Sequence, residues 1–162
     1  MKLNVSDIWT VLESVTDPEI PVLSITDMGI IREVNVNEDV LEVVITPTYS
    51  GCPAMQTIEV NIRAVLQEHG FDKVFVRTVL SPAWTTDWLT ESGKQKLEAY
   101  GIAPPLESSA DKMALFKNGR VVPCPRCHST QTEMISQFGS TACKSLFRCT
   151  ECLEPFDYFK CH

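Results

Sequence analysis

The stretch Cys124-Pro-Arg-Cys127 is followed, after 21 intervening residues, by Cys149-Thr-Glu-Cys152. Each C-x-x-C pair can fold into a tight turn that directs two sulfurs at one point, and two such turns complete a tetrahedron around a metal ion. The spacing therefore predicts a structural zinc site with four cysteine ligands. Two disulfides, or thiols without a metal, are the alternatives, and a four-thiolate site also accepts iron.

Other sulfur and imidazole groups surround these pairs. Cys143 precedes Cys149 by six residues, and Cys161 and His162 end the sequence. Either cysteine could replace a zinc ligand, or Cys143 could be a buried strand residue and Cys161 a free thiol. His128 directly follows Cys127, a position from which an imidazole more often hydrogen-bonds a metal thiolate than binds the metal.

The composition indicates a protein of the reducing cytoplasm. The chain has 162 residues, of which 44% are apolar, so it can form one ordinary domain or two small ones. Seven cysteines without an apolar N-terminal signal region favour metal binding over disulfides. No stretch approaches the roughly 20 apolar residues of a membrane span.

The charge distribution argues against nucleic-acid binding. Residues 1–119 contain 9 lysines and arginines against 17 acidic residues, and residues 120–162 contain 5 against 4. Neither part has the basic surface that a phosphate backbone requires. We therefore expect protein partners, and neither nucleic acid nor membrane.

The periodicity of apolar residues predicts an α+β fold, in which a small mixed sheet packs with helices over residues 1–105. Ser6 is the expected cap of the first helix. Residues 106–114 read as a linker, and residues 115–162 as a β-rich, zinc-ribbon-like domain too small to fold without its metal. The expected order is helix, strand, strand, helix, strand, helix, with strands near 30–36, 40–47 and 73–80 and later helices near 53–68 and 88–100.

Cys52 lies where a loop meets the predicted N-terminus of a helix. Free amides and the helix dipole there should stabilise a thiolate and lower the pKa of Cys52. The residue could be a nucleophile, an iron or cluster ligand, or a small side chain packed under the helix. Thr46, Thr48, Tyr49 and Ser50 add hydroxyl groups around it.

Acidic turns and an aromatic loop are further candidates. Asp17, Glu19 and Asp27 could line the same cleft as Cys52, but hydrogen bonds within turns and caps are the favoured interpretation of each. Trp84 and Trp88 lie on a proline-containing loop, where they could form a docking surface for a partner or cover the end of the sheet.

Several blocks of sequence extend this interpretation. They are Asp17-Pro-Glu-Ile-Pro21, Ile25-Thr-Asp-Met-Gly-Ile-Ile31 and Thr46-Pro-Thr-Tyr-Ser-Gly-Cys-Pro53, then Leu80-Ser-Pro-Ala-Trp-Thr-Thr-Asp-Trp-Leu89 with Tyr100-Gly-Ile-Ala-Pro-Pro105, and the cysteine-rich tail that includes Phe138-Gly-Ser-Thr-Ala-Cys143. The first three resemble the SufT-type family of iron–sulfur cluster assembly factors. The others are similar to the PaaD family, small accessory proteins of the aerobic phenylacetate degradation system.

The resemblance implies a role beside an enzyme that epoxidises phenylacetyl-CoA. In that system a di-iron oxygenase is fed by a reductase with flavin and a [2Fe–2S] cluster, and the PaaD-type protein is an accessory component and not the catalyst. It would assist assembly of iron–sulfur or iron centres in the reductase or oxygenase. Cys52 matches the family's reactive cysteine, and Asp17 and Glu19 match its acidic turn.

One cysteine cannot hold a cluster alone, because clusters usually need four thiolates. A transient cluster or iron at Cys52 would therefore need a homodimer, a client cysteine or a small thiol to complete its ligands. The alternative function is a non-catalytic, zinc-stabilised interaction subunit that scaffolds the complex. A thiol oxidoreductase and a nucleic-acid-binding ribbon are the less favoured hypotheses.

Overall fold

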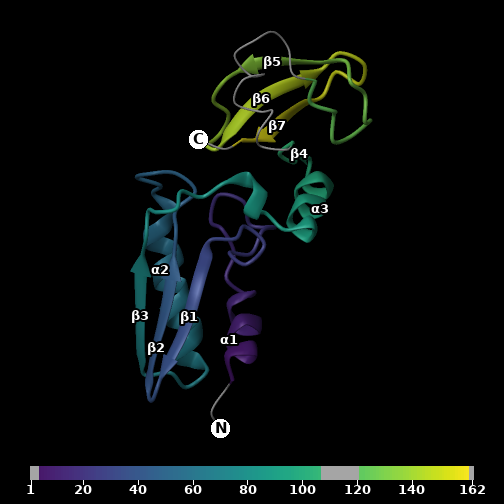
Figure 1. Ribbon diagram of the computed structural model, residues 1–162. Helices are drawn as coiled ribbons and strands as arrows, with labels where there is room; N and C mark the ends of the chain where they lie inside the picture. Colours follow the sequence, from purple (N-terminus) through teal and green to yellow (C-terminus); the bar gives the residue numbers. More distant parts are fainter. Residues whose placement is uncertain (1–3, 107–120, 161–162) are drawn as a thin grey trace. The chain divides into compact units, whose positions relative to one another are not determined.

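The computed structural model describes residues 4–106 and 121–160. The chain divides into two compact units, Met1–Trp84 and Thr85–His162, whose helices and strands are labelled in Figure 1. Each unit has its own small sheet, which confirms the expected α+β class. Within the described residues no helix has the length and apolar character needed to cross a membrane.

The first unit is built on a three-stranded sheet in the order β1-β2-β3. Strands β1 (Ile31–Asn37) and β2 (Val40–Ile45) form an antiparallel hairpin, whose turn places Glu38 at φ 53°. Strand β3 (Lys73–Thr78) runs parallel to β2. Parallel strands need a crossover connection, and α2 (Ala54–Glu68) supplies it. The sheet is therefore mixed, as the sequence predicts.

Helix α2 lies across one face of this sheet (Figure 1). Its four fully buried positions repeat at helical spacing, and β2 presents alternate residues to the same core. These core residues are Ala54, Ile58, Ile62 and Leu66 on the helix and Leu41, Val43 and Ile45 on the strand. The opposite face of the sheet carries the polar side chains of Asn35, Glu42 and Arg77, together with the exposed Phe75.

Helix α1 (Val5–Leu12) begins with a capping box. The Asn4 side chain accepts from the Asp7 amide at 2.9 Å, and Asp7 accepts from the Asn4 amide at 3.0 Å. The expectation that Ser6 caps this helix is wrong, because Ser6 already lies inside its first turn. Asn4 satisfies the same free amide groups two residues earlier.

The second unit starts with a 3₁₀ turn, η1 (Thr86–Trp88), followed by α3 (Glu91–Tyr100). The single helix expected over 88–100 is therefore two elements. Thr90 is extended and its hydroxyl accepts from the Gly93 amide, so a new helix begins there. Gly101 ends α3 at φ 91°, a left-handed conformation that favours glycine.

Four strands form the second sheet, in the order β4-β7-β6-β5. They are β4 (Ile102–Ala103), β5 (Thr132–Ser136), β6 (Lys144–Cys149) and β7 (Pro155–Phe159). Strand β4 runs parallel to β7, and the other pairs are antiparallel. Their small core consists of Ala103, Val122, Cys124, Phe147, Cys149, Phe156 and Tyr158.

The compact units divide between Trp84 and Thr85, whereas the sequence predicts a domain boundary at residue 105. The difference arises because β4 pairs with β7, so residues before 105 contribute to the C-terminal sheet. The predicted linker, 106–114, lies outside the described residues apart from Leu106, and its extent stays a prediction.

Candidate metal centre and thiol site

Cys124, Cys127, Cys149 and Cys152 come together, with their four sulfurs within 4.8 Å of one another. The Cys124 and Cys152 sulfurs are 3.8 Å apart, and those of Cys127 and Cys149 are 3.5 Å apart. Tetrahedral zinc with bonds of about 2.3 Å requires sulfurs about 3.8 Å apart. Disulfides need about 2 Å, so the geometry fits four ligands of one metal ion.

The two C-x-x-C turns share the same backbone design. The residue after each second cysteine is left-handed although it is not glycine, with φ 61° at His128 and φ 64° at Leu153. The next residue, Ser129 or Glu154, then donates its backbone amide to the thiol of that second cysteine. In the second turn the Cys152 amide also points at the Cys149 sulfur, at 3.5 Å. Such amides stabilise thiolate ligands.

Electrostatics explain why this group of thiols suits a cation. Backbone amides of Cys152 and Glu151 lower the pKa of Cys149 to about 7, against a smaller effect of burial. For Cys152 the Glu154 amide also acts to lower the pKa, but burial and the three neighbouring thiols outweigh it and raise the pKa to about 12. Four adjacent thiolates repel one another unless a cation compensates them, so metal binding would release protons.

Cys143 and His128 do not join this cluster. Cys143 is buried, and its sulfur lies 3.0 Å from the Thr141 hydroxyl. The His128 ring nitrogen Nδ1 lies 3.3 Å from Glu98 Oε1 on α3 and forms an ion pair when protonated. Cys161 and His162 lie outside the described residues. Among the described residues, the four cysteines are the one group of three or more His, Cys, Asp or Glu residues arranged to hold a metal ion.

Cys52 lies immediately before helix α2, as expected. Its amide donates to the Tyr49 carbonyl at 3.2 Å, Gly51 supplies the φ of 80° that the turn needs, and the thiol is half-buried. The pKa of Cys52 is raised, which makes the expectation of a lowered pKa wrong. Burial is the largest cause, and it outweighs the hydrogen bond from the Ala54 amide.

Glu19 and Asp17 act on the same thiol. Both carboxylates raise the pKa of Cys52 through their negative charge, Glu19 more than Asp17. Asp17 is itself buried, and its Oδ1 accepts from the amides of Glu19 at 2.8 Å and Ile20 at 2.9 Å. It therefore combines both roles weighed from the sequence, a turn hydrogen bond and a charge beside the thiol. The three residues share one electrostatic environment.

Asp27 has a turn role. Its backbone amide donates to the Ser24 hydroxyl at 3.0 Å, and its Oδ2 accepts from the Ser24 amide at 3.3 Å. These bonds close the turn, and the carboxylates that act on the Cys52 thiol are those of Glu19 and Asp17.

The structure gives distinct environments to two hydroxyl groups that precede Cys52 in the sequence. The Tyr49 side chain hydrogen-bonds the Cys52 thiol and lowers its pKa. Thr46 is 1% exposed at the end of β2, and its hydroxyl has no hydrogen-bond partner among the described residues. From the sequence, ordinary turn polarity is the simpler interpretation of each. Only the folded loop shows that Tyr49 turns back to the thiol, and no local pattern could have shown it.

The two tryptophans occupy different environments. Trp84 is 4% exposed, and its indole N–H donates to the Met28 carbonyl at 2.7 Å. This burial argues against an exposed docking role for Trp84 and is compatible with the alternative in which it covers the end of the sheet. Trp88 is half-buried in the second unit, and its docking role stays a prediction.

In comparisons with known proteins, two different families match the two parts of the chain. Residues 6–76 match the family model of an iron–sulfur cluster assembly protein, and residues 108–160 match that of a PaaD zinc beta ribbon domain. A relative from Escherichia coli (strain K12) is named as a putative component, the D subunit, of 1,2-phenylacetyl-CoA epoxidase. It is 48% identical over 157 residues, which cover 97% of this chain and 93% of the relative.

More distant relatives match the first part of the chain. An "Fe-S protein maturation auxiliary factor" from Porphyromonas gingivalis is 33% identical over 93 residues, covering 56% of this chain and 88% of that protein. The crystal structure of a domain of unknown function from Bacillus anthracis, DUF59, is similar with a TM-score of 0.54 and 25% identity, covering 57% of this chain and 89% of that one. The chain therefore belongs to the PaaD family, which joins an iron–sulfur cluster assembly domain to a zinc beta ribbon.

Proposed function

We propose that the protein is an accessory maturation factor of a phenylacetyl-CoA epoxidase system in the cytoplasm, and not its catalyst. It would assist the assembly of iron–sulfur or iron centres in the reductase or oxygenase subunit. The 48% identity to the Escherichia coli relative supports the system, and the maturation factor of Porphyromonas gingivalis supports the task. The observation that carries the proposal is the Cys52 thiol beside Glu19 and Asp17.

The raised pKa of Cys52 suits transient handling of a cation. At neutral pH the thiol keeps its proton, so the free protein is protected from reaction with other electrophiles. When Fe²⁺ or a cluster iron approaches, the sulfur binds it and releases the proton to solvent, and the positive charge is favoured by the two carboxylates. The remaining ligands come from a client cysteine, a small thiol or a second copy of the chain.

The ribbon has a different task in this proposal. Zinc held by Cys124, Cys127, Cys149 and Cys152 would complete a unit whose core is small, so that it can bind client subunits. The four-sulfur geometry also favours the second candidate function, an interaction subunit in which zinc holds the ribbon and Cys52 has no chemical role. The two functions differ in what happens when the Cys52 sulfur is removed.

Co-expression with the reductase and the oxygenase tests the proposal. Cys52→Ser should leave folding and zinc content unchanged and lower either the iron and acid-labile sulfide content of the purified reductase or the iron content of the purified oxygenase. Cys143→Ser is the matched control, because it removes a buried thiol that lies outside both sites. Full metal loading of both the reductase and the oxygenase with Cys52→Ser would refute the maturation role and leave the interaction subunit as the remaining function.

A further inference from the structure

Strand β3 is an edge of the first sheet. It pairs with β2 on one side, and no described strand pairs with its other side, so part of its backbone N–H and C=O groups face outward (Figure 1). Unpaired edges are templates for another strand, and proteins usually protect them with prolines, bulges, covering loops or charged side chains, which disfavour strands of like charge. Residues 73–78 contain no proline, and the β2–β3 register runs from Val40↔Lys73 to Ile45↔Thr78 without a shift.

The side chains of this edge give it a chemical character. Residues paired across parallel strands share a face, so Lys73, Phe75 and Arg77 lie on the sheet face that also carries Glu42. Phe75 is 59% exposed between the two cations. Residues 1–84 contain only 5 basic residues against 12 acidic ones, and two of the five lie on this strand. The edge is thus a cationic and aromatic stripe in an acidic unit.

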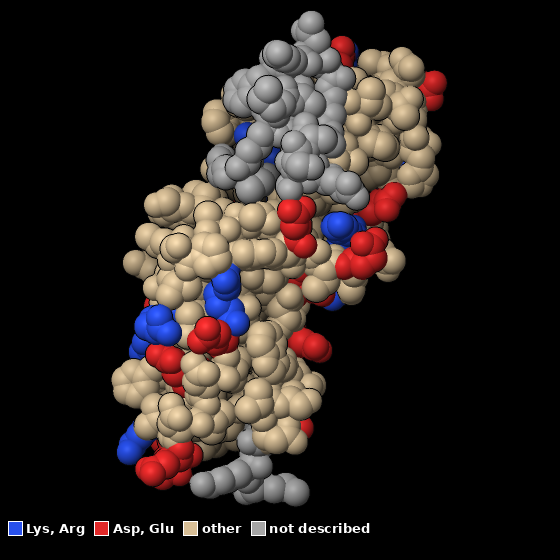
Figure 2. Space-filling model, viewed as in Figure 1, with Lys and Arg blue, Asp and Glu red and all other residues tan. Residues whose placement is uncertain are grey.

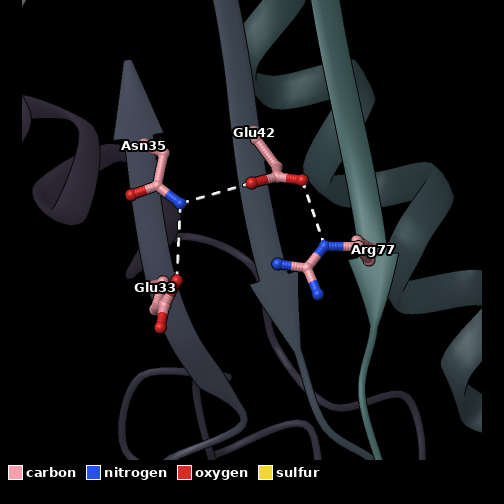
Figure 3. A network of polar contacts seen from close by, with 4 residues as sticks. All are labelled: Glu33, Asn35, Glu42 and Arg77. Atoms are coloured by element: carbon pink, nitrogen blue, oxygen red, sulfur yellow. Dashed lines mark hydrogen bonds and ion pairs between the residues drawn. The ribbon is translucent and has the colours of Figure 1, made fainter. Parts of the chain in front are cut away.

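A network across the sheet holds Arg77 in place. Arg77 Nε donates to Glu42 Oε1 at 3.1 Å, and Asn35 Nδ2 donates to Glu42 Oε2 at 3.2 Å (Figure 3). Asn35 first, and then Arg77, holds the pKa of Glu42 below its ordinary value, so the carboxylate stays charged. Figure 3 shows the Arg77 guanidinium extending from β3 over β2, below Glu42. Its bond to Glu42 uses Nε, so the two terminal nitrogens keep hydrogen-bonding capacity for another carboxylate.

We propose that the outer edge of β3 binds an extended acidic segment of a partner protein, which adds a strand to the sheet. The backbone groups of β3 would form the hydrogen bonds with the new strand. On one face of the segment, two carboxylates would bind Lys73 and Arg77, and the apolar residue between them would pack against Phe75. The identity of the protein that carries this segment rests on the proposed function, whereas the pairing of the segment with β3 does not.

The charges of β3 and of the first unit favour an acidic segment over a second copy of the chain and over a nucleic acid. In a two-fold pairing of β3 with a second copy that places Phe75 on its equivalent, Lys73 would lie opposite Arg77, and like charges directly opposite destabilise a sheet. A nucleic acid would meet the 12 acidic residues of residues 1–84. Figure 2 shows acidic residues interspersed with the basic ones, without an extended basic field.

Titration of the full-length, zinc-loaded protein with a short capped peptide, Glu-Ser-Val-Ser-Glu, tests this proposal, because its two glutamates and its valine share one face of an extended strand. Amide chemical shifts should change along residues 73–78 and little in the ribbon. The same peptide with lysine in place of glutamate should bind at least about tenfold more weakly. The glutamate peptide with N-methyl groups at alternate amides keeps its charge but cannot pair as a strand, and it should not bind.

Variants at the edge provide the matched comparison. Lys73→Glu with Arg77→Gln should weaken peptide binding about tenfold, because two exposed ion pairs are lost. Lys94→Glu on α3 is the control for surface charge and should change binding little. Four results would overturn the proposal. The N-methylated peptide could bind as tightly as the unmodified one, or the amide shifts could change outside residues 73–78 instead. A single-stranded oligonucleotide could bind this strand more tightly than the peptide, or the protein could form a dimer that Phe75→Lys dissociates.

This experiment is separate from the test of the maturation role. Peptide binding is measured without any cluster, and Cys52→Ser should leave it unchanged. If the edge variants keep Cys52 intact but lower the iron or cluster content of the client subunit, the segment belongs to the client. Unchanged client loading by Cys52→Ser would refute the maturation role even if the peptide binds as proposed.

Discussion

The two thiol sites of this protein differ in how their chemistry is specified. In the ribbon, two nearly identical local turns direct four sulfurs at one point, and the same left-handed residue and amide donor recur in each. At Cys52, one sulfur depends on burial, a tyrosine and two carboxylates 33 and 35 residues away in sequence. Local repetition arranges four sulfurs to fit one metal ion, whereas a long-range environment sets the pKa of a single thiol.

Loss of the metal should have the largest effect, and it should be confined to one unit. Cys124→Ser, or removal of zinc with a strong chelator, should unfold the second sheet, because structural zinc contributes on the order of 10 kcal/mol in small domains. Hydrogen exchange should show lost protection in β6 and β7. Protection of α2 and β2 should persist, since the first unit has its own sheet. Simultaneous loss in both units would show that they fold together.

A backbone change in one turn should have a smaller effect. Leu153 is 70% exposed and left-handed, so its side chain contributes little packing. Leu153→Val should destabilise the zinc-loaded second unit by about 1 kcal/mol relative to Leu153→Gly, because β-branched residues fit this conformation poorly. Thermal unfolding of both variants measures the difference. Equal stability would mean that the φ of 64° is not required by the turn.

Removing a charge should change Cys52 and leave the ribbon unaffected. Glu19 raises the pKa of Cys52, so Glu19→Gln should lower that pKa and make the thiol react with iodoacetamide at lower pH. The pH profile of the labelling rate, read by mass spectrometry of the Cys52 peptide, measures this. In the unaltered protein the midpoint should lie above the ordinary value of 9.0. A midpoint below 9.0 would contradict the environment described for the site.

Tyr49→Phe should shift the same profile in the opposite direction and by less. The tyrosine lowers the pKa of Cys52 by hydrogen bonding, and its effect ranks after that of Glu19. Its loss should therefore raise the labelling midpoint. A lowered midpoint would show that the hydroxyl stabilises the protonated thiol instead.

The sequence predicts the ribbon well because its determinants are local. The C-x-x-C spacing alone indicates which sulfurs meet, and the periodicity indicates the mixed sheet of the first unit. The pairing of β4 with β7 could not be predicted, because two residues carry no periodic pattern. The cap at Asn4 was missed because Ser6 is an equally good capping residue type.

At Cys52 the sequence predicts the position but not the pKa. The helix N-terminus is where the local pattern places it, and a thiol at such a position is ordinarily a stabilised thiolate. Burial raises the pKa of Cys52 and so opposes the effect of the helix N-terminus. The charges of Glu19 and Asp17 act on the thiol only after the chain has folded. Trp84 is a similar case, since only the fold shows that its N–H is bonded to Met28.

Metal analysis of anaerobically purified protein tests most directly whether the reversible chemistry belongs to Cys52 and the permanent metal to the ribbon. We predict stoichiometric zinc in both the unaltered protein and Cys52→Ser, with iron bound after incubation with Fe²⁺ and a small thiol only when the Cys52 sulfur is present. Iron binding that is unchanged in Cys52→Ser, or zinc that is lost with this sulfur, would contradict this division of roles.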